Sequence, residues 1–317
     1  MLYVKRIAAF LVLLCSTCIL IVCASYLFSP KNNTAEAGME EVSANGILAE
    51  AENTVDALVI GDSESYCAIT PMQIWQEQGY TSYVCGTDAQ TLDYSLTLYR
   101  RTLEKQSPKL VILETDAIYR DISESSACIT EASNICAVFR YHNRWKSLNA
   151  LDFTTTATYT NVNDYKGYVY NTKTDGCETR DYMAYTEKSA EISQRAREYV
   201  QKIKDLCDEN GAQLLFLSTP SSYNWNYERH NGISALAAEL ECDYLDLNLE
   251  SDALQIDWQT DTKDKGDHLN YYGAQKTTHY LANYLAQTGL LTDHRGDGRY
   301  ESWDESLSKY EASVSSN

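Results

Sequence analysis

Short apolar runs alternate with longer segments in which apolar residues recur every three or four positions. A short continuous apolar run predicts a strand that is buried on both faces of a parallel sheet. The longer amphipathic segments predict helices that cover such a sheet. We predict strands at 55–60, 82–85, 110–113, 213–218 and 243–247, and helices at 71–78, 91–105, 187–209, 227–240 and 274–287. This alternation predicts an α/β domain with helices on both faces of a parallel sheet.

The N-terminal segment has a different pattern. Lys5 and Arg6 precede an uncharged apolar run at 7–28, which is about the length that a helix needs to span a bilayer. Positive charge before the run predicts that this end faces the cytoplasm. We therefore predict a cytoplasmic stub at 1–6, a transmembrane anchor at 7–28, and a single-pass protein of the cell membrane whose folded domain is extracytoplasmic.

A cleaved signal peptide and a lipoprotein signal are two alternatives for the apolar run. Val22-Cys23-Ala24 could be a signal-peptide cleavage site, although the run is long for a cleaved signal. Leu20-Ile21-Val22-Cys23 weakly resembles a lipoprotein signal, but valine stands where a small residue is preferred. All three interpretations place the rest of the chain outside the cytoplasm, and we favour the uncleaved anchor.

Polarity divides the remaining chain into segments. Residues 29–53 are polar and predict a linker. The strand and helix pattern defines a domain at 54–292, which is interrupted at about 120–185 by a polar and aromatic insertion too long for a simple connection. Such insertions usually lie over a binding site and select the substrate. Residues 293–317 are charged and serine-rich, which predicts a poorly ordered polar tail.

Charge and cysteine spacing exclude several functions. The formal net charge is -19, so the surface repels phosphate groups. We expect neither nucleic-acid binding nor adhesion to anionic lipid through a basic patch. The chain has 10 cysteines, but none has the spacing of a zinc site, and we expect no metal and no cofactor. Cys128 and Cys136 could form a local disulfide, although free thiols are the default expectation.

Gly61-Asp62-Ser63 directly follows the first predicted strand. Ligands of open parallel sheets bind beyond the carboxyl ends of the strands, so a serine at this point can project its hydroxyl into the crevice. The N-terminus of a following helix would stabilise developing negative charge. All three residues also favour turns, and the tripeptide alone could be no more than the turn that ends the strand. Asp62 is interpreted as a turn residue.

A second polar segment, at 261–270, precedes the last predicted helix and contains His268. A serine hydroxyl is a poor nucleophile until a base removes its proton, and a histidine suits that task near neutral pH. A carboxylate must orient the imidazole, and the segment offers Asp261, Asp264 and Asp267. His268 could instead cap the helix or lie on the surface, as a lone histidine usually does.

Two further segments could contribute to a binding site. Residues 140–145 include two arginines and a tryptophan and could line a groove for a glycan or an anionic substrate, although a packed insertion with surface arginines is the more ordinary interpretation. Residues 221–225 follow the fourth predicted strand and could border the crevice. His142, His230 and His279 have no evident partner and are interpreted as structural.

Together, Gly61-Asp62-Ser63 and the histidine segment resemble the SGNH (GDSL-type) hydrolases. The similarity is closer to extracytoplasmic bacterial members allied to alginate O-acetylation proteins and to the teichoic-acid D-alanyl transfer protein. Residues 267–276 are similar to their final block, in which His-Leu-Asn is followed by Gly-Ala. The resemblance covers roughly 54–287 and is specific at its two ends. It implies a three-layer α/β/α, flavodoxin-like SGNH fold with a parallel central sheet.

The resemblance also implies roles for individual residues. Ser63 would be the nucleophile, and His268 would be its base. The backbone N–H groups of Ser63 and Gly86 would form part of the oxyanion hole that holds the negatively charged oxygen of the intermediate.

The chain departs from the family pattern at two points. The family commonly places its aspartate three residues before the histidine, where this chain has Lys265. Asp264 and Asp267 are therefore the candidates for orienting the histidine, and we prefer Asp264 because adjacent side chains usually point apart. The family's third block, Gly-x-Asn-Asp, is missing, and Glu114-Thr115-Asp116 stands in its place. The side-chain donor of the oxyanion hole is therefore unassigned.

The motifs and the expected location imply a serine-dependent acyl-ester hydrolase or O-acyltransferase with a Ser-His-Asp acyl-enzyme mechanism, with hydrolysis the more expected outcome. Its substrate would be an acylated cell-envelope or exported polysaccharide, or a small acyl ester. The membrane would be contacted through the N-terminal helix, and other cell-envelope proteins are candidate partners. The alternative is a catalytically silent SGNH-like protein that binds glycan or acts as a scaffold, which the two departures favour.

Overall fold

The structure is a computed structural model that describes residues 2–178 and 181–316. Parts of three predicted segments lie outside the described residues: Met1 of the stub, 179–180 of the insertion, and Asn317 of the tail. Contacts divide the chain into two compact units. We call residues 43–122 and 162–317 the sheet unit. We call residues 1–42 and 123–161 the helical unit.

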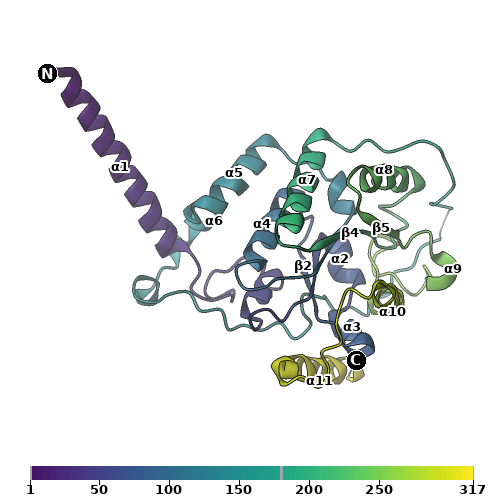
Figure 1. The fold of residues 1–317 in the computed structure, drawn as a ribbon. Coiled ribbons are helices and arrows are strands. Elements are labelled where there is room, and N and C mark those ends of the chain that lie inside the picture. Colours follow the sequence, from purple (N-terminus) through teal and green to yellow (C-terminus); the bar gives the residue numbers. More distant parts are fainter. Residues whose placement is uncertain (1, 179–180, 317) are drawn as a thin grey trace. The chain divides into compact units, whose positions relative to one another are not determined.

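The sheet unit is built on five parallel strands (Figure 1). They are β1 (Ala57–Gly61), β2 (Ser82–Gly86), β3 (Leu110–Glu114), β4 (Gln213–Ser218) and β5 (Asp243–Asp246). Their order in the sheet is β2-β1-β3-β4-β5, which is the flavodoxin-like order of doubly wound folds. Strands β1, β2 and β3 are buried along their whole length, as their unbroken apolar runs require. The predicted parallel α/β architecture is confirmed.

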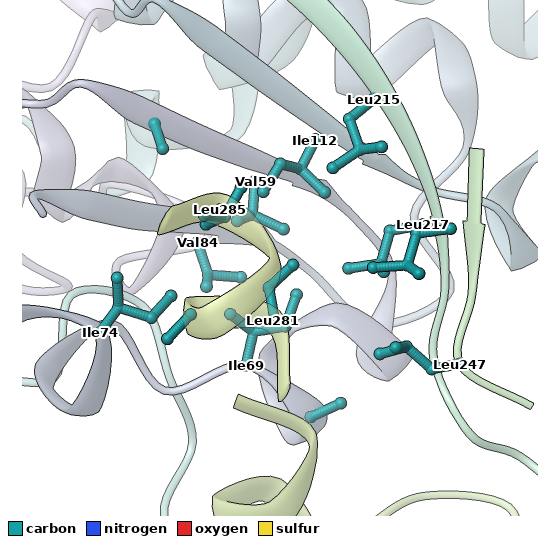
Figure 2. Close-up of a cluster of buried hydrophobic side chains, with 14 of the residues drawn as sticks. Val59, Ile69, Ile74, Val84, Ile112, Leu215, Leu217, Leu247, Leu281 and Leu285 are labelled. Carbon is teal, nitrogen blue, oxygen red and sulfur yellow. The ribbon is translucent and has the colours of Figure 1, made fainter. Parts of the chain in front are cut away.

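One face of the sheet is covered by α2 (Ser63–Ala68), α3 (Pro71–Gln78) and α10 (Tyr271–Thr288). Figure 2 shows Leu281 and Leu285 of α10 packed among side chains from several strands, including Val59 of β1. Successive strand residues point to opposite faces, so the equally buried Leu58 and Ile60 point to the other face. There, α4 (Leu92–Thr102) and α7 (Gln194–Glu209) contact each other and the sheet. The predicted three layers are therefore present.

The remaining elements of the sheet unit lie in its connections. α8 (Tyr227–Glu239) contacts β5, and α10 contacts α9 (Ser251–Leu254). The described residues of this unit also form three short 3₁₀ helices, η1 (Ala44–Ala49), η2 (Asp116–Tyr119) and η5 (Gly298–Tyr300). Helix α7 begins at Gln194, where Ser193 caps it, rather than at the predicted residue 187.

The prediction of a poorly ordered polar tail at 293–317 was wrong over most of its length. Residues of the tail form α11 (Glu301–Ser315), which contacts α3. Trp303 is fully buried, with its ring centroid 5.8 Å from that of Trp75, and the Trp75 indole N–H donates to Asp304 at 3.0 Å. Buried residues of α11 recur at helical spacing along one face, from Trp303 to Tyr310. The charged and serine residues of the other face obscured this pattern.

The prediction of a linker at 29–53 was also wrong for its last residues, which belong to the folded sheet unit. Ile47 and Leu48 of η1 are buried in the sheet unit, and η1 contacts β2 and α4. Glu50 forms a buried ion pair with Lys166 at 2.9 Å. The sheet unit therefore begins near Ser43, and the part of the predicted insertion after residue 161 also belongs to it.

The helical unit contains α1 (Leu2–Phe28), α5 (Glu124–Ile135), α6 (Val138–Tyr141), η3 (His142–Lys146) and η4 (Ala150–Phe153). By length and composition, α1 is long and apolar enough to cross a membrane, and none of its residues is buried. A signal sequence near an N-terminus has the same properties. Cys128 and Cys136 are both free, so the alternative of a local disulfide is not realised.

Docking of α11 predicts a large stability effect. Trp303→Ala should lower the free energy of unfolding by about 3–5 kcal/mol, because it removes a fully buried aromatic ring from between two helices. Urea denaturation of the full chain in detergent, followed by circular dichroism, measures the change. Glu305→Ala, an exposed substitution on the same helix, is the matched control. Equal stability of both variants and the wild type would show that α11 is not docked.

Candidate active site

The end of β1 determines the position of Ser63. Ser63 is the first residue of α2, so its backbone N–H has no partner within that helix. Asp62 caps the helix by accepting a hydrogen bond from the Glu64 N–H at 3.0 Å. Gly61 is required before this turn, because a Cβ at this position would lie 2.5 Å from the Cβ of Glu114 on the neighbouring strand.

A small hairpin before α10 presents His268. Thr262 and Leu269 form an antiparallel bridge, and the Lys263 N–H donates to the His268 carbonyl at 3.1 Å. At the tip of the hairpin, Lys265 and Gly266 both have positive φ angles, of 62° and 87°. Two consecutive residues in this left-handed conformation reverse the chain, so the residues on either side of them face each other.

Asp264, His268 and Ser63 form a continuous hydrogen-bonded chain. The Ser63 Oγ lies 2.7 Å from the His268 Nε2. The opposite ring nitrogen, Nδ1, lies 2.7 Å from the Asp264 Oδ2. The other oxygen of Asp264 accepts a hydrogen bond from the backbone N–H of His268 at 2.7 Å, which fixes the carboxylate as well as the ring.

Asp267 makes a different set of contacts. Its nearest carboxylate oxygen is 3.7 Å from the His268 Nδ1, beyond hydrogen-bond length. The other oxygen accepts a hydrogen bond from the Asn224 amide at 2.6 Å. Partial burial acts to raise the pKa of Asp264, but hydrogen bonds from the ring and backbone of His268 outweigh it, and the pKa lies below its ordinary value. Asp264 is thus held as a carboxylate beside the imidazole.

Gly86 ends β2 and pairs in register with Gly61. A Cβ on Gly86 would lie 2.5 Å from the Ser65 Oγ, so glycine allows this backbone to approach α2 closely. Carboxylates stand at the carboxyl end of β3, at Glu114 and Asp116. Glu114 is buried and accepts hydrogen bonds from the Asp116 N–H at 3.1 and 3.2 Å.

A cluster of buried acids surrounds the base of the serine turn. Burial, reinforced by the charge of Asp62, raises the pKa of Glu64 well above its ordinary range. The pKa of Glu114 is raised well above its ordinary value by burial and by the charges of Asp62 and Asp116. Burial, then the charge of Asp116, raises the pKa of Asp62 to about 6, although Arg120 opposes this shift.

Two arginines pair with the aspartates of the cluster. Arg120 pairs with Asp62 at 2.5 Å and with Asp116 at 3.2 Å. Arg229 pairs with Asp116 at 2.5 Å and stacks over the Tyr119 ring, with the guanidinium carbon 4.7 Å from the ring centroid. These two cations keep the cluster from concentrating negative charge beneath the serine.

A polar cavity of about 420 Å³ lies beside the cluster. It is lined by residues that follow β2, β3 and β4, namely Ala89, Thr91, Asp116, Tyr119, Arg120, Asp121, Asn224 and Arg229. Asn224 connects this cavity to the histidine hairpin, because its amide donates to both Glu64, at 3.0 Å, and Asp267. The cavity therefore lies at the carboxyl ends of the strands, where parallel sheets bind ligands.

Glu64, Asp267 and His268 can each offer one metal-ligating atom, and these three atoms lie within 4.8 Å of one another. Both ring nitrogens of His268 already have hydrogen-bond partners, Ser63 and Asp264. A metal ion bound to the imidazole would have to displace one of them. We therefore assign no metal to these residues.

Several residues of the site were not predicted from the sequence. Nothing in the local sequence marks Glu64 as buried. Nor does it mark Arg120 and Arg229 as partners of the acids near Ser63, because these residues come from separate parts of the chain. The predicted border segment 221–225 does contribute, through Asn224. The predicted groove segment 140–145 belongs instead to the helical unit.

Two histidines interpreted as lacking partners have them. His230 Nδ1 lies 2.8 Å from Asp246, and His279 Nδ1 lies 3.0 Å from Glu77. The ring of His142 lies against a local backbone carbonyl, that of Phe139, with its Nδ1 at 3.2 Å.

No protein-family model and no curated protein matches this chain. Among solved structures, the chain is similar to a GDSL-like lipase from Bacteroides thetaiotaomicron, with 12% sequence identity and a TM-score of 0.39 over 78% of this chain and 99% of that one. It is also similar to a lipase/acylhydrolase from Enterococcus faecalis, with 10% identity and a TM-score of 0.38 over 75% and 98% of the two chains. Values this low carry no argument about activity, so the activities of those proteins are not assigned to this chain.

The raised pKa of Glu114 predicts a pH-dependent contribution to stability. The folded protein holds the Glu114 proton more tightly than the unfolded chain does. The stability that this side chain contributes is therefore fully present below the unfolded pKa of about 4.3, and it is lost as the pH rises toward the folded pKa. Glu114→Gln remains neutral and escapes this loss. The free energy of unfolding of the wild type, minus that of the variant, should therefore fall as pH rises from about 4.

Urea denaturation across a pH series measures this difference. Glu209→Gln, which removes an exposed carboxylate from α7, is the matched control. A difference between wild type and Glu114→Gln that rises with pH would show that Glu114 is ionised in the folded protein.

Proposed function

We propose that this chain is an SGNH-type serine acyl-ester hydrolase or O-acyltransferase. The observation that carries the proposal is the hydrogen-bonded chain from Asp264 through His268 to Ser63, with both links at 2.7 Å. A hydroxyl, an imidazole and a carboxylate in this order constitute the arrangement that activates a serine for acyl transfer.

In the proposed reaction, the Ser63 Oγ attacks the ester carbonyl carbon while the His268 Nε2 accepts the hydroxyl proton. Asp264 holds the Nδ1 proton and stabilises the resulting imidazolium. The backbone N–H groups of Ser63 and Gly86 are the proposed donors to the oxyanion. The intermediate collapses as the C–O bond to the leaving alcohol breaks and His268 returns the proton to that oxygen. An acyl-Ser63 ester remains.

The second half of the reaction decides the class of enzyme. If water attacks the acyl-Ser63 ester, with His268 again taking the proton, the product is a free acid. If a sugar hydroxyl attacks, the acyl group is transferred. The polar cavity lined by Arg120, Arg229 and Asn224 supports a hydroxyl-rich substrate over a long hydrocarbon chain. We propose an acylated cell-envelope or exported polysaccharide as that substrate, with α1 as a membrane anchor and the sheet unit outside the cytoplasm.

A catalytically silent glycan-binding or scaffold protein is the second candidate function. It is favoured by the carboxylates that replace the family's third block, because no side-chain amide donor stands at this position, where Glu114 accepts hydrogen bonds from the Asp116 N–H. A fluorophosphonate probe separates the two candidates. It should label Ser63 if the hydroxyl is activated, and a folded chain without label would favour the silent protein.

Ser63→Ala should abolish turnover of a chromogenic acetyl ester, because no other atom can form the acyl-enzyme in the proposed reaction. Initial rates with p-nitrophenyl acetate measure the effect, and an unchanged circular-dichroism melting curve establishes that the variant is folded. Ser308→Ala, which replaces an exposed serine of α11, serves as the control for nonspecific damage. Undiminished hydrolysis by Ser63→Ala would remove the basis of the proposal.

Asp264→Asn should lower kcat by about 10³- to 10⁴-fold, because an amide at this position disfavours the ring tautomer that accepts the serine proton. Asp267→Asn should have a much smaller effect, since Asp267 does not reach hydrogen-bond distance of the ring. Steady-state kinetics of both variants on the same ester make the comparison. The reverse order of damage would assign the orienting role to Asp267.

A further inference from the structure

The C-terminal end of α1 is tied to a later part of the chain in the helical unit. Arg144 donates from Nη1 to the carbonyls of Phe28 and Ser29, at 2.8 and 2.9 Å. Its Nη2 pairs with Asp152 at 2.7 Å, and both side chains are nearly buried. These bonds satisfy carbonyl groups that a helix end leaves without partners. They also hold the segment around Arg144 and Asp152 beside the C-terminal end of α1.

Large apolar side chains next to this tie are exposed. Trp145, Leu151 and Phe153 are 63%, 63% and 58% exposed, although they flank the buried Arg144 and Asp152. The same is true of the preceding helices α5 and α6, in which Ile129, Ile135 and Phe139 are 59%, 84% and 46% exposed. Side chains of this size are not usually gathered on a water-facing surface.

An apolar groove of about 800 Å³ runs between α1 and these helices. Its α1 side is formed by Thr17, Leu20, Ile21 and Ala24, and its other side by Cys128, Ile129, Ala132, Val138, Phe139 and His142. One wall of the groove is therefore part of the apolar run that is long enough to cross a membrane. If lipid surrounds that run, its acyl chains also have access to the groove.

The length of α1 indicates at which level of a bilayer the groove would lie. With 27 residues at about 1.5 Å per residue, the helix is about 40 Å long, whereas the hydrocarbon core of a bilayer is about 30 Å thick. Its last turns therefore reach the interface. Leu20 lies about 12 Å before Phe28 along the axis, so the groove would extend from near the headgroup boundary into the outer part of the acyl chains.

Amphipathic side chains near the end of α1 suit this depth. The Lys31 ammonium lies 3.8 Å from the centroid of the Tyr26 ring, and the Tyr26 hydroxyl donates to the Thr155 carbonyl at 3.2 Å. Tyrosine, tryptophan and lysine side chains are enriched at this level of a membrane, where one end of the side chain is apolar and the other is hydrated.

We propose that the segment 128–153 lies in the outer interface of a lipid bilayer beside α1, with lipid acyl chains occupying the apolar groove. The proposal rests on the proposed membrane placement of α1 and is independent of catalysis. The attraction is hydrophobic rather than electrostatic, which is consistent with the net charge of -19. The helical unit thus holds the membrane through two elements, a spanning helix and an interfacial segment.

Photolabelling tests this placement. The full chain is reconstituted in phosphatidylcholine vesicles that contain a small fraction of phosphatidylcholine with a diazirine in the middle of one acyl chain, and adducts are mapped by peptide mass spectrometry after illumination. We expect adducts on α1 and on peptides covering 128–139 and 145–153. Peptides containing Leu249, an exposed apolar residue of the sheet unit, should carry several-fold fewer adducts.

A double variant, Ile129→Glu with Phe139→Glu, should lose adducts on 128–139 and keep those on α1, and Leu249→Glu is its matched control. Adducts confined to α1 would overturn the proposal while leaving α1 in the membrane. An absence of adducts on α1 would overturn its membrane placement as well. Dimers captured by cross-linking, together with unlabelled 128–153, would overturn the proposal by assigning the face to a second copy of the chain. Hydrolysis of a soluble ester is not expected to change in any of these variants.

Discussion

The hydrogen bond between the Ser63 Oγ and the His268 Nε2 joins residues 205 positions apart, and the rest of the site is arranged around it. It can form because β1 is an interior strand whose carboxyl end leads directly into α2, while α10 packs against the same face of the sheet as α2. The core shown in Figure 2 is therefore what brings the two ends of the site together. A hydroxyl and an imidazole at this distance need no large rearrangement before proton transfer.

The histidine hairpin determines which carboxylate contacts His268. Asp264 lies four residues before His268, and Lys265 stands three residues before it. The left-handed conformations of Lys265 and Gly266 return the chain so that Asp264 contacts both the backbone and the ring of His268. A side chain larger than glycine at 266 would meet the Ser222 Oγ, whose position a built Cβ approaches to 2.1 Å.

The sequence was sufficient for the parts of the fold that local pattern controls. Unbroken apolar runs predicted the strands, and the position of Ser63 after β1 followed from them. The sequence pattern did not predict burial where a side chain is covered by residues that are far away in the chain. Trp303 and Tyr310 lie on one face of a helix that is otherwise charged, and only the contact with α3 explains its order. Glu64 and Glu114 could not be recognised as buried acids, because carboxylates are ordinarily exposed and a partner such as Asn224, which bonds Glu64, is distant in the sequence.

The buried acids impose a constraint on any chemistry at Ser63. A tetrahedral intermediate places negative charge on its oxygen, and ionised carboxylates beneath the serine would oppose that charge in a medium of low polarity. Burial keeps the pKa values of Glu64 and Glu114 high, so both favour the neutral form. Asp62 and Asp116 lie against guanidinium groups that offset their charge. The cluster can therefore be acidic in composition and still have little net charge. A low net charge beneath Ser63 is needed if an oxyanion is to be stable beside it.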